Sequence, residues 1–428
     1  MGLLGVFLVL LLLGLPVLVS LGLSASVYLL MNSSISPEIM ASATYGGMDS
    51  FTRLSIPLFI LAGQIMMTGG VSRRLVNVAK MCFKDPVSGV GNISILSSAF
   101  FGAVCGSSAA TVSAIGGIMS PEMDRAHYKK AYTAALIAAA GFLGILIPPS
   151  GPLVIYAVAA DQSVGKLFIA VITTGIMFTV AFIILNRLIC RKWVEAEGLK
   201  PAVDDGEKVS KLHTLVDAIP ALLMPLIILG GIYGGIFTPT EAAAVACIYG
   251  LIVSFFIYKS LKLSDLPKIF KASAISSANI LLIIGVANFF GRVLTIFKVP
   301  QAVATFITGI SDNRFVILLI INLFLLILGM FMETATAIVL TTPILLPLVV
   351  NLGMDPIHFG IMMIVNLSVG LITPPMALNM FVSSQITDVS IGKMVKPIIP
   401  YIAVSVALLL LVIYIPGISM WLPKLLWG

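Results

Sequence analysis

Two Pro-Pro pairs, each inside a long apolar stretch, limit most strongly how this chain can fold. Pro148-Pro149 ends the apolar run 143–147, and Pro374-Pro375 ends a similar run, 369–373, which lies 226 residues further along. Proline lacks a backbone N–H and disfavours helix in the residue before it, so no helix continues unbroken through either pair. Inside a membrane the carbonyl groups freed by such a break are tolerated only where protein covers them or where they line a cavity. The sequence therefore predicts two broken helices at equivalent positions of an internal repeat.

The composition indicates that these breaks lie in a membrane protein. Hydrophobic residues make up 59% of the 428 residues and charged residues 10%, whereas soluble domains carry about 25% charged residues. This excludes an ordinary soluble enzyme, and the high hydrophobicity excludes a disordered chain. The net charge of +7 is typical of basic cytoplasmic loops, so it does not indicate nucleic-acid binding. We expect an all-α polytopic protein in contact with the lipid bilayer, with room for on the order of a dozen crossings of about 20 residues each.

The apolar segments predict where these crossings lie. Residues 2–31 contain Pro16 and form either two short spans or one long kinked helix. The polar stretch 191–212 is expected to be a cytoplasmic linker. Further spans are expected near 54–68, 131–160, 167–189, 214–236, 240–258, 273–297, 357–385 and 398–420.

The charges predict that the two copies of the repeat are inverted in the membrane. Seven basic residues flank segment 88–121, whereas only Lys298 and Arg314 flank the equivalent segment 314–347. Basic residues mark the cytoplasmic side, and the five crossings expected between the segments, an odd number, place them on opposite faces. Many secondary transporters are built from such inverted repeats. The seven residues are Arg73, Arg74, Lys80, Lys84, Arg125, Lys129 and Lys130.

Each of these two segments predicts a re-entrant helical hairpin. Both are apolar at their ends and polar in the middle, where the first has Gly106-Ser107-Ser108 and the second has Glu333-Thr334 followed by Thr336. We expect each tip to face a Pro-Pro break near the membrane midplane. Freed carbonyls and hydroxyls there are hard oxygen ligands suited to an alkali cation. Small residues such as Gly102 also suit close helix packing.

Two charged residues stand inside predicted spans. Glu333 occupies the position of Ser107 in the other copy, and an acid deep in a membrane indicates function: it binds a cation, carries a proton or pairs with Arg292. Arg292 either extends towards Lys298, forms an ion pair or recognises an anionic substrate. Candidate substrate ligands are Ser108, Ser150, Thr336, Asn379 and Arg292.

The known sequence signatures of enzymes and ATP-driven pumps are missing. The chain has no H-E-x-x-H, G-x-S-x-G, Walker A or G-x-G-x-x-G run. Transport without an ATP site would draw on an ion gradient. An ion channel and an intramembrane enzyme that uses Glu333 or Asp217 are the alternatives from other classes, and the inverted repeat argues against a channel because alternating access uses inverted halves.

These residues resemble a known family. Segment 102–123, the Pro-Pro breaks and the run 329–347 are similar to the large membrane subunit of the tripartite ATP-independent periplasmic (TRAP) transporters, over nearly the whole chain. The resemblance implies a sodium-coupled importer of organic acids in the bacterial inner membrane, with the elevator-type fold of the ion-transporter superfamily. It also implies two partners: a periplasmic substrate-binding protein and a small membrane subunit, expected here as a separate chain. The substrate is expected to be sialic acid, with a C4-dicarboxylate or another acid as the alternative.

The resemblance also implies where ions bind and which parts move. The coupling ion would be Na⁺, with no organic cofactor, and the substrate would lie between the two tips. The expected parts are scaffold helices in 1–87, a first transport motif in 88–166, scaffold helices in 167–312, a second transport motif in 313–393 and a C-terminal span in 394–428. The expected sodium ligands are Gly106, Ser107, Ser108, Gly144, Ile147 and Pro149 at the first site, and Glu333, Thr334, Thr336, Gly370, Thr373 and Pro375 at the second.

Overall fold

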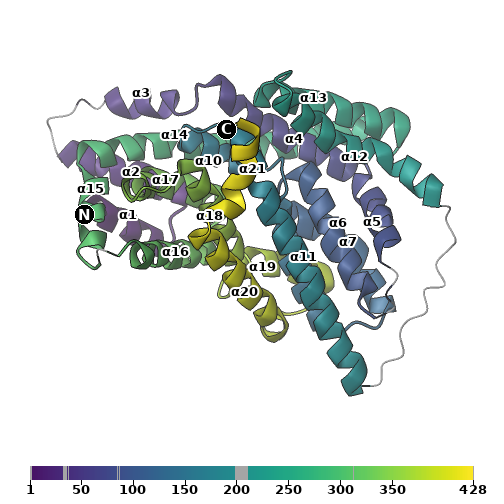
Figure 1. Cartoon of the computed structure of the whole chain (residues 1–428). Coiled ribbons are helices and arrows are strands. Elements are labelled where there is room, and N and C mark those ends of the chain that lie inside the picture. The colour runs from purple at the N-terminus through teal and green to yellow at the C-terminus, as the bar shows by residue number, and fades with distance from the viewer. Residues whose placement is uncertain are drawn as a thin grey trace.

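The computed structural model describes residues 2–31, 36, 38–83, 85, 87–197, 211–311 and 313–427, and within these residues all regular structure is helical (Figure 1). Eight of the described helices are long and apolar enough to cross a membrane. The number of candidate spans rises to nine if the helix pair Lys130–Leu146 and Gly151–Ala159, which is bent by 47°, is counted as one span. All five segments expected to cross between the two hairpins are among them. The predicted all-α, multi-span fold is confirmed.

The internal repeat is visible in the order of the helices. Five helices of the first half begin again in the second half 225 to 227 residues later, so the repeat covers more than the Pro-Pro breaks that revealed it. The first set is α6 (Gly89–Cys105), α7 (Ser108–Arg125), α8 (Lys130–Gly141) with the short α9 (Leu143–Leu146), α10 (Gly151–Ala159) and α11 (Val164–Glu197). The second set is α16 (Arg314–Phe331), α17 (Thr334–Asn351), α18 (Pro356–Gly370), α19 (Leu378–Thr387) and α20 (Ile391–Tyr414).

The core lies around the two helices that precede the breaks. Every residue of α18 from Ile357 to Gly370 is buried, and so is every residue of α8 from Tyr132 to Gly141. A helix that is apolar on all sides belongs in the interior, and these two equivalent helices fill that place in both halves. Each break therefore begins inside the protein, where freed backbone groups are covered, and the second break reaches the surface at Pro375.

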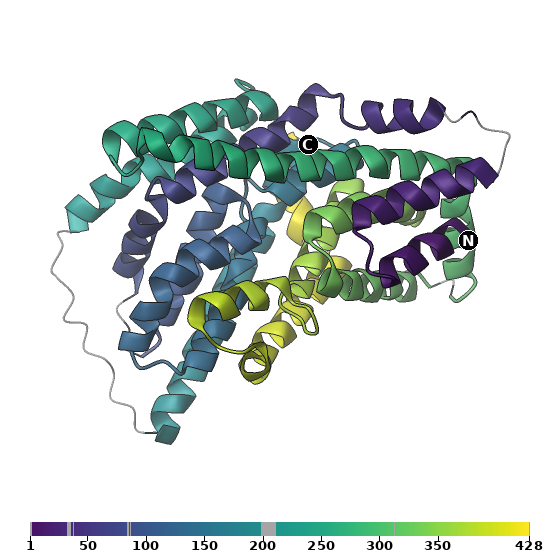
Figure 2. The same ribbon diagram turned by 180° about the vertical axis from the view of Figure 1, so that it is seen from behind.

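Another group of helices packs along one side of the repeat. The longest, α14, runs across the molecule from the α12–α13 end to the α1–α2 end (Figure 2). The Arg74 guanidinium lies 3.1 Å from the Asp217 carboxylate and 3.5 Å above the Tyr258 ring, and these contacts join α5 to α12 and to the end of α13. The group contains α3 (Glu38–Gly46), η1 (Phe51–Leu54), α4 (Ser55–Thr68), α5 (Val71–Cys82), α12 (Lys211–Tyr233), α13 (Pro239–Ile252) with η2 (Val253–Ile257), η3 (Leu263–Asp265), α14 (Leu266–Ile296) and α15 (Val299–Thr308).

Helix α11, the last member of the first set, packs against other helices of the repeat. It lies along α6, α9, α18 and α20. Asn186 of α11 is fully buried, and its amide donates to Asn92 Oδ1 at 2.7 Å and to the Ser88 carbonyl at 3.0 Å. The Tyr132 hydroxyl donates to Asn186 Oδ1 at 2.7 Å and lies 2.8 Å from the Tyr401 hydroxyl on α20. Buried polar contacts of this kind fix one arrangement of α6, α8, α11 and α20.

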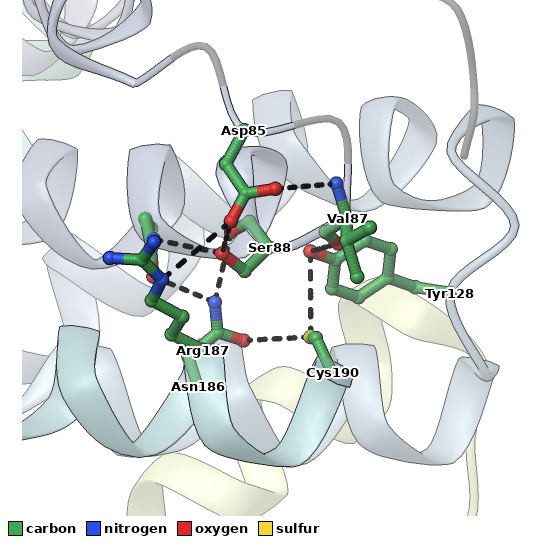
Figure 3. Close-up of polar contacts among 8 residues, drawn as sticks. Asp85, Val87, Ser88, Tyr128, Asn186, Arg187 and Cys190 are labelled. Carbon is green, nitrogen blue, oxygen red and sulfur yellow. Dashed lines mark hydrogen bonds and ion pairs between the residues drawn. The ribbon is translucent and has the colours of Figure 1, made fainter. Parts of the chain in front are cut away.

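Figure 3 shows how this network continues to the surface at the start of α6. The Ser88 hydroxyl donates to Asp85 at 2.6 Å, and the Arg187 guanidinium lies 4.0 Å from the same carboxylate. Burial acts to raise the pKa of Asp85, but hydrogen bonds from Ser88 and Val87 and the charge of Arg187 hold it below its usual value. The Cys190 thiol lies between the Tyr128 hydroxyl and Asn186 Oδ1. The first hairpin is therefore fastened to α11 at its base.

Three boundaries differ from the expectations or complete them. Residues 2–31 form two helices, α1 (Gly2–Leu12) and α2 (Val17–Met31), because Pro16 follows a left-handed turn at Gly14. The expected last span, about 398–420, is present with different bounds: α20 begins at Ile391 and ends at Tyr414, and α21 (Gly417–Trp427) follows Pro416 as a separate helix. The expected linker, 191–212, is helical at both ends: residues 191–197 continue α11, and residues 211–212 begin α12. Residues 198–210 lie outside the described residues.

Candidate functional site

The first hairpin turns at a glycine in a left-handed conformation. Helix α6 ends at Cys105, Gly106 has φ of 61°, Ser107 is extended, and α7 begins at Ser108. The Gly106 carbonyl accepts from the Gly151 N–H at 3.3 Å, so the tip is bonded to the residue that follows the first break. A Cβ on Gly106 would lie 2.6 Å from the Pro149 carbonyl oxygen. Only glycine fits here, in both backbone conformation and space.

The second hairpin turns without a glycine. Helix α16 ends at Phe331, Met332 and Glu333 are extended, and α17 begins at Thr334. Glu333 is exposed, whereas the Thr334 side chain is buried and its hydroxyl has no hydrogen-bond partner in the described part of the chain. A buried hydroxyl without a partner is costly unless a ligand completes it. This hydroxyl is the strongest single indication of a bound group at the second tip.

Each hairpin lies directly against the broken helix of its own half. A Cβ on Gly102 of α6 would lie 2.6 Å from Gly144 Cα, and a Cβ on Gly370 of α18 would lie 2.6 Å from Gly329 Cα on α16. The close helix packing that the sequence suggested at Gly102 is thus present, and Gly329 and Gly370 form the equivalent contact in the second half. Only glycine pairs allow backbones to approach this closely.

The two breaks differ in exposure. Both Pro-Pro bonds are cis. Pro148, Pro149 and Ser150 are buried, whereas Pro375 and Met376 are exposed. Near the first break a Cβ on Gly144 would lie 2.9 Å from the Ser107 carbonyl oxygen and would overlap the Thr111 hydroxyl. Two oxygens therefore lie beside Gly144, the Ser107 carbonyl and the Thr111 hydroxyl that donates to it at 2.7 Å, and oxygen atoms are the ligands that hard cations prefer.

Both hairpin tips line one cavity. Its walls come from α4, α10, α14 and both hairpins, and they are mostly apolar with a few polar groups. The expected residues that line it are Gly106, Ser107, Ser108, Pro149, Glu333 and Thr334. Concave, mainly apolar pockets with a few converging polar groups are the usual form of a small-molecule site.

Other predicted site residues lie around this cavity rather than on it. Asn379 is fully buried: its Oδ1 accepts from the Ser108 hydroxyl at 2.8 Å, and its Nδ2 donates to the Ala138 carbonyl at 3.1 Å. Thr336 and Ser150 are also buried, and the Ser150 hydroxyl has no partner among the described residues. The first tip is therefore held by a residue from the second half of the chain.

At the second break two candidate sodium ligands are already hydrogen-bonded. The Thr373 hydroxyl donates to the Val369 carbonyl at 2.7 Å, and the Gly370 carbonyl accepts from the Thr373 N–H at 3.0 Å. Pro375 is exposed at the rim of the break. At the first break, Ile147 is half-buried and its N–H donates to the Leu143 carbonyl.

Sequence reasoning missed three polar residues, two of which lie outside the repeat. Gln64 of α4 and Ser276 of α14 line the same cavity, opposite the tips. A glutamine inside the apolar span 54–68 was a signal for Gln64. Thr111, which lies one turn after Ser107, had no signal beyond its spacing, since its closeness to Gly144 depends on how α7 packs on α9.

Arg292 lies in a second cavity. This cavity is lined by apolar residues of α10, α14 and α17 and by four polar ones, Arg53, Asn288, Arg292 and Thr295. It shares Ile155 with the cavity between the tips. The structure thus places Arg292 in a different cavity from the tips, and Arg53 lines the same cavity.

Comparisons with known proteins agree with this architecture. Residues 4–418 match the family model described as "Tripartite ATP-independent periplasmic transporter, DctM component". The chain is 40% identical over 405 residues to the C4-dicarboxylate TRAP transporter large permease protein DctM of Pseudomonas aeruginosa, covering 95% of this chain and 94% of that protein. It is 34% identical over 415 residues to the sialic acid TRAP transporter large permease protein SiaM of Vibrio cholerae, covering 97% and 96%.

A fused relative and solved structures complete the comparison. The chain is 40% identical to the isethionate TRAP transporter permease protein DctMQ of Oleidesulfovibrio alaskensis over 97% of this chain, but it spans 65% of that protein's length. The YdaH transporter of Alcanivorax borkumensis shares the fold at a TM-score of 0.62 and 17% identity, covering 89% of this chain and 87% of that one. MtrF of Neisseria gonorrhoeae shares the fold at a TM-score of 0.57 and 15% identity, covering 89% of this chain and 83% of that one. The chain therefore belongs to the DctM family, the multi-pass inner-membrane permease component of the tripartite ATP-independent periplasmic transporters, and it is a transporter rather than an enzyme.

Proposed function

We propose that this permease imports an organic acid together with sodium ions, and that both bind around the cavity between the two hairpin tips. The observation that carries the proposal is that this one cavity is lined by both tips, Ser107-Ser108 from one half and Glu333-Thr334 from the other. A site shared by two inverted halves is the arrangement on which alternating access depends.

Sodium is proposed at two sites built from oxygen atoms. At the first, Gly106, Ser107 and Ser108 would act with the carbonyls of Gly144, Ile147 and Pro149, and the Ser107 carbonyl already lies close to Gly144. At the second, the hydroxyl of Thr334 lacks a partner within the described residues. Glu333 and the oxygens of Thr336, Gly370, Thr373 and Pro375 complete the second proposed set.

The substrate is proposed to be a carboxylate or a related organic anion. The relatives are named for C4-dicarboxylates, isethionate and sialic acid, all of which are anionic. Ser108 would contact the substrate directly, and Asn379 would hold Ser108 in place from behind. Ser150 and Thr336 are proposed to shape the site from the buried side.

An elevator movement is proposed for the repeated helices. Because α11 and α20 are bonded to α8 and to the base of the first hairpin, we propose that α6–α11 and α16–α20 move as one unit. The helices α4 and α12–α14 would form the scaffold. This redraws the expected boundaries, since it moves 167–197 and the residues after 393 into the transport unit.

The tripartite family description implies two further components. We propose that a periplasmic binding protein delivers the acid and that a small membrane subunit joins the scaffold. In the fused relative both permease parts are one protein, as its name DctMQ indicates.

Uptake into proteoliposomes that contain the permease and its two partner components tests the proposal. Radiolabelled succinate, isethionate and N-acetylneuraminate are compared with an inward sodium gradient and with choline in place of sodium. We expect uptake of at least one acid, and its collapse without sodium. Uptake that continues unchanged in choline would overturn the sodium coupling, and uptake of none of the three would overturn the substrate class.

A further inference from the structure

The cavity that contains Arg53 and Arg292 has no assigned role. It lies between η1 and α14 on one side and α10 and α17 on the other. Ile155, which is 1% exposed, lines both this cavity and the cavity between the tips. The two cavities are therefore neighbours that share Ile155 in their walls.

Arg53 reaches this cavity because η1 is pressed onto α14. A Cβ on Gly47 would lie 2.6 Å from Asn288 Cβ, and a Cβ on Gly285 would lie 2.8 Å from Met48 Cγ, so the chain before η1 contacts α14 closely at both points. The Arg53 Nη1 donates to the Gly46 carbonyl at 2.7 Å, which holds the guanidinium in place. Its Nε is buried and has no hydrogen-bond partner in the described part of the chain.

Arg292 comes to the same cavity from α14. It stands one helical turn after Asn288, so both side chains lie on one face of that helix. Neither Arg53 nor Arg292 is within 4.0 Å of a carboxylate in the parts of the chain that the structure describes. Two guanidinium groups that line one cavity and are not paired with a carboxylate of the described chain favour the binding of an anionic ligand. Their planar donors suit a carboxylate or a sulfonate.

The position of the cavity indicates when such an anion would bind. Helix α4 starts beside Arg53 and ends at Thr68, close to the basic residues Arg73 and Arg74, and α14 starts near Lys268 and Lys271 and ends beyond Arg292. Both arginines therefore lie at the ends of their helices that are remote from these basic clusters. By the positive-inside rule this is the periplasmic side.

We propose that Arg53 and Arg292, with Asn288, form a capture site for the acidic group of the incoming substrate, distinct from the site between the hairpin tips. This proposal rests on the proposed function, since it takes an organic acid as the substrate. The anion binds here first and then passes Ile155 to the tips. Because the cavity walls belong to both the scaffold and the moving unit, movement of the unit changes the cavity and releases the anion.

The rate at which a cysteine in the cavity wall is labelled tests the capture site without a transport assay. Ala159 is exposed at the end of α10 and lines the cavity, so Ala159→Cys places a thiol there. The purified permease variant in lipid nanodiscs is labelled with an anionic methanethiosulfonate (sulfonatoethyl) and with a cationic one (trimethylammonioethyl), and labelling of residue 159 is measured by peptide mass spectrometry. We expect the anionic reagent to react about tenfold faster, because the arginines raise the local anion concentration.

Variants identify the charges that are responsible. Arg53→Gln and Arg292→Gln should each reduce this preference, Arg53→Lys should retain most of it, and Lys298→Gln is the matched control, since Lys298 is exposed near Arg292 but does not line the cavity. Succinate, isethionate or N-acetylneuraminate at millimolar concentration should slow the labelling, and loss of one arginine should weaken that protection about tenfold.

The outcomes separate this proposal from the preceding one. Equal rates for the two reagents, a preference that persists in the doubly substituted protein, or protection by none of the three acids would overturn the capture site. Protection by sodium chloride equal to that by the acids would overturn its assignment to organic anions. The labelling requires neither a sodium gradient nor the partner components, so sodium-dependent uptake remains an independent result.

Discussion

The two hairpin-and-break units have the same order of helices but differ at their tips. The first tip is bonded to its own break through Gly106 and Gly151 and to the other half through Ser108 and Asn379. The second tip carries an exposed Glu333 and a buried Thr334 hydroxyl without a partner among the described residues. Closely packed glycines fasten both hairpins to their broken helices, so the difference is confined to the tips and the breaks. One repeat thus provides a tip closed by protein contacts and a tip whose contacts a ligand would complete.

Gly106→Ala should cause the largest loss of stability, because it disrupts the backbone turn of the closed first tip. The new Cβ meets the Pro149 carbonyl and forces a left-handed conformation on a residue that resists it. We expect a loss of about 3 kcal/mol or more of stability, measured by thermal unfolding in detergent. Gly117→Ala on α7 is the matched control, since a Cβ there meets nothing within 4 Å. Equal melting temperatures for the two variants would contradict the closed tip.

Gly102→Ala and Gly370→Ala test the close glycine packing between hairpin and broken helix, which the two units share. Each places a Cβ against the backbone of the neighbouring helix, 2.6 Å from Gly144 Cα or Gly329 Cα. We expect similar losses of about 2 kcal/mol in both halves, measured in the same unfolding assay. A large loss in one half alone would show that the two units are packed differently along their whole length.

Ser108→Ala removes the bond that joins the first tip to the second half. Asn379 Oδ1 then loses its donor in the protein interior, and we expect a cost of about 1 kcal/mol. Ser97→Ala is the control, because the Ser97 hydroxyl of the same hairpin is buried without a partner in the described chain. A double-mutant cycle with Asn379→Ala should show coupling, and additive effects would argue against the bond.

Thr334→Val should have the smallest effect in sodium-free buffer. The Thr334 hydroxyl has no described partner to lose, so we expect a change within about 0.5 kcal/mol. Sodium should raise the melting temperature of the parent protein by mass action and raise that of the variant less. The sodium titration of both proteins by thermal unfolding measures this, and an identical sodium response would remove Thr334 from the proposed ligand set.

Much of the fold followed from local chemistry that the sequence carries openly. A Pro-Pro pair removes two neighbouring backbone donors, so the breaks at Pro148-Pro149 and Pro374-Pro375 were predictable, and so were the hairpin turns between long apolar runs. A single proline is a weaker signal: Pro416 follows the end of α20, but Pro397 and Pro400 lie inside the same helix. The packing of α11 against α6, α18 and α20 was not visible in its composition, because a buried asparagine such as Asn186 changes the composition of a long apolar helix very little.

The site was only partly predictable, because pairs of distant residues depend on packing. Ser108 and Asn379 were each named as candidates, but their hydrogen bond depends on how α19 lies across α7 and α8. Arg53 joins Arg292 only because Gly47 and Gly285 let η1 approach α14. No pattern along the chain connects residues 53 and 292.

The hydrogen bond between Ser108 and Asn379 has a consequence for how variation in this family should be read. It joins positions from the two copies of the internal repeat, so neither copy can change its tip freely. A relative with a different side chain at position 108 should carry a matching change at position 379, and transfer of one hairpin between permeases should succeed only when its distant partner is transferred with it.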